Sequence, residues 1–137
     1  MATAVLLTGR PGSGKTTLVE RIVAHWPGTA GGFYTRELRR GGERTGFELV
    51  TLAGERAALA SVERRGGPRV GKYGVDLRTL DEVGVPALQR AAREADLVVI
   101  DEIGKMELLS PAFVAAVRAL LEGPCRLLGT IMAAPHP

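Results

Sequence analysis

The chain has 137 residues, 45% of them hydrophobic, which fits one globular domain with a single core. Its net charge is +3, but its 15 arginines and three lysines are interleaved with acidic residues, so the sequence does not favour a nucleic-acid partner. No apolar run approaches the roughly 18 residues that span a bilayer, and the single cysteine excludes an internal disulfide. We therefore expect a cytoplasmic protein without a membrane partner.

The first half of the chain predicts a strand, a helix and a hairpin. Residues 4–8 (AVLLT) are an apolar run typical of a fully buried parallel strand. Apolar residues then recur at helical spacing from position 18 to Trp26, where Pro27-Gly28 ends the helix. GGFYTREL and TGFELVTL are β-rich runs joined by RRGGER, which predicts an antiparallel hairpin with a Gly-Gly turn.

The second half alternates helices with strands. Residues 53–72 predict no definite element, and Thr79 or Asp81 is the candidate cap of a helix over residues 85–95. LVVID and RLLGTIM read as buried strands, and between them Ser110-Pro111 begins a helix that ends at Gly123-Pro124. This alternation predicts an α/β fold over residues 1–137, with a mostly parallel sheet and an attached antiparallel hairpin.

A glycine-rich phosphate-binding motif follows the first strand. Residues 9–16 (GRPGSGKT) match G-x-x-x-x-G-K-[ST] between a strand and a helix, the context that this motif requires. Backbone N–H groups would surround the phosphates, Lys15 would bridge the β- and γ-phosphates, and the Thr16 hydroxyl would bind Mg²⁺. The candidate nucleotide-binding residues are Gly9, Arg10, Pro11, Gly12, Ser13, Gly14, Lys15, Thr16 and Thr17.

The strand LVVID runs directly into two carboxylates in the stretch LVVIDEIGKMEL. Because an unpaired buried carboxylate is costly, we expect Asp101 to end a strand beside the P-loop strand and to bind Mg²⁺ there. Glu102 suits a general base for the attacking water, or alternatively an N-terminal helix carboxylate or an ion-pair partner. Lys105 could pair with either carboxylate, reach the phosphates, or be a solvated lysine. Glu107 could belong to the site or be a surface charge.

Taken together, these motifs resemble a known family. GRPGSGKTTLV, GGFYTREL, RTGFELVTL, GKYGVDLRTLDEVGVPAL and LVVIDEIGKMEL occur in the order found in the small P-loop nucleoside-triphosphatases of thermophilic prokaryotes and in the cancer-related nucleoside-triphosphatase of animals. The resemblance implies Mg²⁺-dependent hydrolysis of nucleoside triphosphates to diphosphate and phosphate, with broad base tolerance. It also implies a three-layer α/β/α P-loop fold, RecA-like or kinase-like.

The resemblance also suggests residue roles. Lys15, Thr16, Asp101 and Glu102 keep the roles given above, and Lys105 belongs to the characteristic family segment. Two further family segments are matched, one in the hairpin and one after it. They comprise Thr35, Arg36 and Glu37, and Lys72, Tyr73 and Gly74. The second segment should face the site. Arg36 would stabilise transition-state charge in cis, unless it is simply a solvated strand arginine.

Chains of the resembled family continue past the equivalent of Pro137 with further helix and strand. The chain is therefore expected to lack the family's last C-terminal elements. We expect this to leave RLLGTIM as an open sheet edge that favours self-association, with the oligomeric state itself undecided.

Two other functions remain open. A small-molecule or nucleotide kinase would need an acceptor site and a lid, for which residues 63–72 are a candidate. A switch that binds nucleoside triphosphates and associates with nucleic acid would turn over very slowly.

Overall fold

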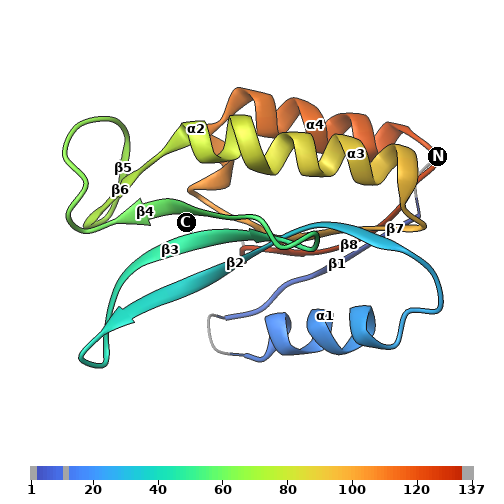
Figure 1. The fold of residues 1–137 in the computed structure, drawn as a ribbon, viewed down its shortest axis with the longest axis horizontal. Coiled ribbons are helices and arrows are strands. Elements are labelled where there is room, and N and C mark those ends of the chain that lie inside the picture. The colour runs from blue at the N-terminus through green and yellow to red at the C-terminus, as the bar shows by residue number, and fades with distance from the viewer. Residues whose placement is uncertain (1–2, 11–12, 134–137) are drawn as a thin grey trace.

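The computed structural model describes residues 3–10 and 13–133 as a three-layer α/β/α structure. One sheet lies in the middle, with helix α1 on one face and helices α3 and α4 on the other (Figure 1). The strands are β1 (Thr3–Leu7), β2 (Ala30–Arg40), β3 (Glu43–Thr51), β4 (Arg56–Ser61), β5 (Arg69–Val70), β6 (Tyr73–Val75), β7 (Leu97–Ile103) and β8 (Arg126–Ile131). The helices are α1 (Lys15–Ala24), α2 (Leu77–Thr79), η1 (Leu80–Gly84), α3 (Val85–Glu94), η2 (Glu107–Leu109) and α4 (Pro111–Glu122).

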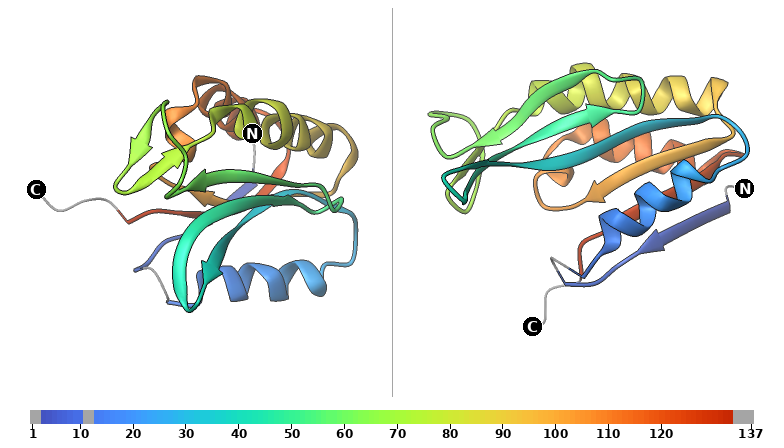
Figure 2. Two further views of the ribbon diagram at one scale, coloured as in Figure 1. Left: turned by 60° about the vertical axis from the view of Figure 1, so that its left-hand side comes forward. Right: turned by 60° about the horizontal axis from the view of Figure 1, so that its bottom comes forward.

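The sheet is mixed. Its strand order is β1-β8-β7-β2-β3-β4-β6-β5. The first four strands of this order pair in parallel, and the remaining pairings are antiparallel. The predicted hairpin is confirmed as β2 and β3, but it is part of the main sheet because β2 also pairs with β7 (Figure 2). The prediction of a mostly parallel sheet is therefore wrong.

The position of β8 corrects two further predictions. It lies between β1 and β7, so the strand of Asp101 is not adjacent to the P-loop strand. It also pairs on both sides, so RLLGTIM is not the open edge. Among the described strands the two edges of the sheet are β1 and β5. Val5 of β1 is 53% exposed and Leu6 is 36% exposed, so the prediction of a fully buried strand there is wrong. A short apolar run has the same pattern at the edge and in the centre of a sheet.

Two apolar layers hold the helices to the sheet. Val98 and Ile100 of β7 belong to the layer beneath α3 and α4, together with the Phe33–Phe113 ring pair. Leu97 and Val99 belong to the layer that packs on Val19 of α1. Because side chains alternate along a strand, Asp101 continues the row of Leu97 and Val99 on the α1 side. The alternation thus directs Asp101 toward the helix that follows the phosphate-binding loop.

The helix that was predicted over residues 85–95 is confirmed as α3, Val85–Glu94, but helical turns precede it directly. Its cap is neither Thr79 nor Asp81, since the Asp76 carboxylate accepts from the Arg78 N–H at 3.1 Å and the helical turns run on from Leu77. The second predicted cap is confirmed: Ser110 Oγ accepts from the Phe113 N–H at 3.0 Å, and its hydroxyl donates to Asp81 at 2.6 Å. Strands β4 and β5 fall within residues 53–72, where no element was predicted.

The exposed edge strand predicts concentration-dependent self-association. Val5→Lys places a charge on that edge and should shift the chain toward monomer, because edge lysines oppose strand pairing. Leu121→Lys is the matched control, since Leu121 is an exposed apolar residue of α4 (41% exposed), away from the edge. Sedimentation velocity over a concentration series measures the shift. A monomeric wild-type chain at every concentration would contradict the prediction.

Candidate functional site

The phosphate-binding motif forms the turn between β1 and α1. Gly14 caps the helix with φ 90°, a conformation that favours glycine, and no side chain caps the first turn. The first intrahelical bond is donated by the Leu18 N–H to the Gly14 carbonyl at 3.0 Å. The preceding N–H groups at the helix start therefore have no intrahelical acceptor and can bind an anion. Of the predicted nucleotide-binding residues, Pro11 and Gly12 lie outside the described residues.

Lys15 lies between the loop and the end of β7. Its Nζ donates to the Gly9 carbonyl at 3.1 Å and lies 3.7 Å from Glu102 Oε2. Its side chain is only 15% exposed, so its charge is directed into the molecule. The structure thus brings together the predicted lysine and the predicted general base.

Asp101 has a buried carboxylate, and one of its two oxygens lacks a hydrogen-bond partner among the described residues. The residue is 3% exposed, and its Oδ1 accepts from the Thr130 hydroxyl at 2.6 Å. Its Oδ2 is buried without a hydrogen-bond partner among the described residues. An unpaired buried carboxylate oxygen is costly unless a cation meets it. The peptide bond that joins Asp101 to Glu102 is cis.

The side chains around Asp101 fit Mg²⁺. Thr16 and Asp101 line the same cavity and offer a hydroxyl and a carboxylate, the hard oxygen donors that this ion prefers. The described residues contain no cluster of three or more His, Cys, Asp or Glu side chains that could hold a metal ion. Mg²⁺ sites commonly use one or two protein ligands, with water and substrate phosphates completing the set.

The two further charged residues of the DEIGKMEL segment, Lys105 and Glu107, differ in their burial. Lys105 is exposed, and no ion pair of the described residues includes it. Glu107 is 4% exposed, so its interpretation as a surface charge is wrong. Its Oε1 accepts from the Gly104 N–H at 3.0 Å and so holds the turn after Glu102. Burial, aided by the charges of Glu102 and Asp101, raises the pKa of Glu107 to about 7.

The hairpin supplies the opposite wall of the site. A cavity of about 440 Å³ is lined by Gly14, Lys15, Thr16, Thr17, Thr35, Glu37, Arg44, Phe47, Asp101 and Glu102. Another cavity of about 450 Å³ lies between α3 and α4, but its lining is apolar apart from Gln89. Of these two cavities, the first is the one that is lined by charged side chains. Thr35 and Glu37 of the predicted hairpin motif are in it.

Arg36 is not among the residues that line this cavity. Its Nη2 donates to Glu20 Oε2 on α1 at 3.0 Å, and its guanidinium lies 5.6 Å from the centre of the Tyr34 ring. The cavity arginine is Arg44, which the sequence did not single out because alternation along a strand marks many exposed arginines equally. Tyr73 of the predicted KYG segment reaches the site indirectly, since its hydroxyl accepts from Arg44 Nε at 3.1 Å.

Known proteins share both this sequence and this fold. A model of the family described as NTPase matches residues 4–137. The chain belongs to the NTPase family. The nucleoside-triphosphatase THEP1 of Thermotoga maritima is 46% identical over 133 residues, covering 97% of this chain and 76% of that protein. The cancer-related nucleoside-triphosphatase homolog of Bos taurus is 42% identical over 144 residues, covering 96% of this chain and 76% of that protein.

Solved structures of the NTPase family agree with the fold. THEP1 from Aquifex aeolicus superposes with a TM-score of 0.85 at 39% identity, covering 98% of this chain and 78% of that one. A human cancer-related nucleoside triphosphatase gives 0.77 at 42% identity, with the same coverage. The prediction of a P-loop nucleoside-triphosphatase is thereby confirmed at the level of the family. No described helix is long and apolar enough to cross a membrane.

Glu107 predicts a pH dependence of stability. Its pKa is higher in the folded chain than the usual 4.5, so the folded state binds the extra proton. The stabilisation is complete below about pH 4.5 and is lost as the pH rises through about 7. Relative to Glu107→Gln, which cannot titrate, the wild-type free energy of unfolding should fall by roughly 3 kcal/mol across that interval.

Urea denaturation at a series of pH values measures this difference. Glu63→Gln is the matched control, because the Glu63 side chain is 76% exposed and should behave like wild type. A constant difference between wild type and Glu107→Gln from pH 4.5 to 8 would show that the pKa of Glu107 is the same in the folded and unfolded chain, and would contradict the prediction.

Proposed function

We propose that the chain hydrolyses nucleoside 5′-triphosphates to diphosphate and phosphate in a Mg²⁺-dependent reaction at the charged cavity. The observation that carries the proposal is the buried, unpartnered Asp101 Oδ2 beside Thr16, at the N-terminus of a helix with free N–H groups. A cation and an anion are both needed to complete such a site. A magnesium-bound triphosphate supplies both.

Different residues of the chain would bind the phosphates and the Mg²⁺ ion. The N–H groups of the loop and of the first turn of α1 would bind phosphate oxygens, and Lys15 would move from Glu102 to the β- and γ-phosphates. Thr16 and Asp101 would hold Mg²⁺, which neutralises phosphate charge when it is bound. Thr130 fixes the orientation of the Asp101 carboxylate through its hydrogen bond to Oδ1.

Glu102 is the best placed base. Its side chain is 40% exposed, faces the cavity and pairs only with Lys15 among the described residues. When Lys15 turns to the phosphates, the Glu102 carboxylate becomes free to accept a proton from water beside the γ-phosphate. Glu107 would position this carboxylate, because it holds Gly104 two residues further along the chain.

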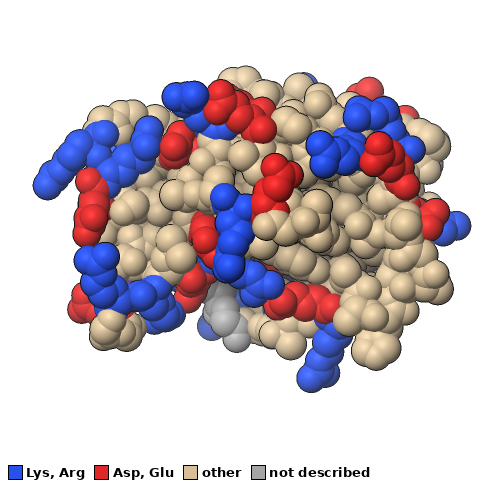
Figure 3. Space-filling view, in the orientation of Figure 1, with Lys and Arg blue, Asp and Glu red and all other residues tan. Residues whose placement is uncertain are grey.

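The substrate range and the surroundings of the protein are also part of the proposal. The names of the relatives specify a nucleoside triphosphate without naming a base, so we propose that several bases are accepted. Nucleic acid is not a proposed partner. On the face drawn in Figure 3, basic side chains are interspersed with acidic ones in place of a broad basic surface. A cytoplasmic location fits the single cysteine, Cys125.

Phosphate release without an acceptor tests the proposal. With Mg²⁺ and ATP, GTP, CTP or UTP, Glu102→Gln should lower the rate by about 10²–10⁴-fold, because the proton acceptor is lost. Nucleotide affinity should change only a few-fold, since the phosphate-binding groups remain. Glu20→Gln is the matched control, because Glu20 pairs with Arg36 and does not line the cavity.

Release that needs an added phosphate acceptor would contradict hydrolysis and favour a kinase. Tight nucleotide binding with no release from the wild-type chain would favour the switch. Equal rates in wild type and Glu102→Gln would leave hydrolysis in place but remove Glu102 from it.

A further inference from the structure

Arg44 is the second cation of the cavity that contains Lys15 and Glu102. Among the described residues that line this cavity, Lys15 and Arg44 are the two with positive charge. They come from opposite walls, Lys15 from the start of α1 and Arg44 from β3. A triphosphate placed between these walls therefore meets a cation on each side.

The sheet topology explains how a residue of β3 reaches the site. The pairing of β2 with β7 stops at Tyr34 and Asp101, yet β2 continues to Arg40. These six further residues extend about 20 Å past Asp101, at roughly 3.3 Å per residue. The hairpin therefore overhangs the end of the sheet at which the phosphate-binding loop lies (Figure 1).

The position of the γ-phosphate follows from Lys15. This lysine would bridge the β- and γ-phosphates, and its Nζ already lies 3.7 Å from Glu102. The γ-phosphate is thus expected between Lys15 and Glu102, with the hairpin wall as the next group outward. Thr35 lies on the same wall, and its hydroxyl is buried without a hydrogen-bond partner among the described residues.

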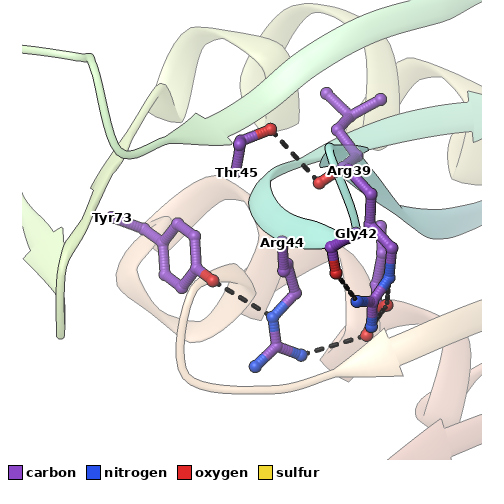
Figure 4. A network of polar contacts seen from close by, with 7 residues as sticks. Arg39, Gly42, Arg44, Thr45 and Tyr73 are labelled. Carbon is purple, nitrogen blue, oxygen red and sulfur yellow. Dashed lines mark hydrogen bonds and ion pairs between the residues drawn. The ribbon is translucent and has the colours of Figure 1, made fainter.

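The Arg44 guanidinium is held in place by hydrogen bonds, but they do not use all of its N–H donors. Nε donates to the Tyr73 hydroxyl at 3.1 Å (Figure 4). Nη1 donates to Glu37 Oε1 at 3.0 Å. The guanidinium also lies 5.5 Å from the centre of the Phe47 ring. Nη2 has no hydrogen-bond partner among the described residues, and the side chain is 43% exposed. A planar fork fixed along one side and open on the other suits an incoming phosphate oxygen.

Glu37 positions Arg44 but does not neutralise the positive charge around it. Its Oε2 accepts from Arg39 Nε at 3.1 Å and from Arg39 Nη2 at 2.8 Å, so two arginines share one carboxylate. The cluster of Glu37, Arg39 and Arg44 keeps a net positive charge. Hydrogen bonds from Arg39 and then from Arg44 hold the pKa of Glu37 below its usual range, so this carboxylate is ionised at neutral pH.

We propose that Arg44 is a catalytic residue of this nucleoside-triphosphatase, which contacts the γ-phosphate and stabilises the charge that develops on it during hydrolysis. The sequence suggested this role for Arg36 on β2, and the proposal assigns it to Arg44 on β3. Tyr73 and Glu37 are its positioning residues. The inference rests on the proposed function, because it assigns a role within the same hydrolysis.

Arg44→Ala and Arg36→Ala form the matched test pair. Both remove one arginine of the hairpin, but only Arg44 lines the cavity. With saturating Mg²⁺ and ATP, Arg44→Ala should lower the rate of phosphate release at least about 100-fold, and Arg36→Ala less than about threefold. Added guanidinium ion should partly restore the rate of Arg44→Ala alone.

A binding measurement tests the same contact without turnover. Calorimetry with Mg²⁺ compares a non-hydrolysable triphosphate, the diphosphate, and the diphosphate with aluminium fluoride, which mimics the transferring phosphoryl group. Arg44→Ala should lose at least about tenfold in affinity for the aluminium fluoride complex and change less than about threefold for the diphosphate. Tyr73→Phe should lie between wild type and Arg44→Ala, because Arg44 then keeps its charge but loses one anchor.

The outcomes distinguish the proposed hydrolysis from the proposed role of Arg44. If the wild-type chain releases no phosphate, the proposed function fails, while the calorimetry still decides whether Arg44 contacts a γ-phosphate. If Arg44→Ala does not fold, Arg44→Lys keeps the charge without the planar fork and should show the same selective loss. Equal effects of the Arg44 and Arg36 variants, or equal losses for diphosphate and aluminium fluoride complex, would overturn the assignment.

Discussion

The buried Oδ2 of Asp101, which has no hydrogen-bond partner among the described residues, is the constraint on which the proposed site depends. A buried charge of this kind destabilises the fold unless a cation meets it. The strand LVVIDEI nevertheless buries it, because alternation along β7 turns Asp101 to the side of α1 and Thr130 satisfies its other oxygen. In the proposed function, this electrostatic cost favours the binding of a metal-bound phosphate group at Asp101.

The remaining charges are arranged around that point by the sheet. The free N–H groups at the start of α1 and the Lys15 ammonium supply positive charge from one wall, and the overhanging hairpin supplies Arg44 from the other. Glu102 lies between them with an exposed side chain, and Glu107 holds the turn that follows it. In the proposed reaction, once Lys15 has turned to the phosphates, charges held in place by such supporting contacts would stabilise the transition state with little further reorganisation.

Local patterns predicted the local parts of this structure. The strand and helix that flank GRPGSGKT, the hairpin and the Ser110 cap need only neighbouring residues to define them, and the sequence predicted each correctly. The order of the parallel strands depends on long-range pairing, so the insertion of β8 beside β1 and the exposure of Val5 were missed. The sequence also could not show which hairpin arginine lines the cavity, since that depends on which partner, Glu20 or Tyr73, each side chain meets in three dimensions.

The most direct test is the thermal stability of Asp101→Asn with and without Mg²⁺ and a non-hydrolysable triphosphate. Asparagine keeps the shape and can still accept from Thr130 but removes the buried charge, so the variant without ligand should be at least as stable as wild type. Ligand should raise the wild-type unfolding temperature and leave that of the variant almost unchanged. A variant that is destabilised without ligand, yet gains as much from Mg²⁺ and triphosphate as wild type does, would contradict the account.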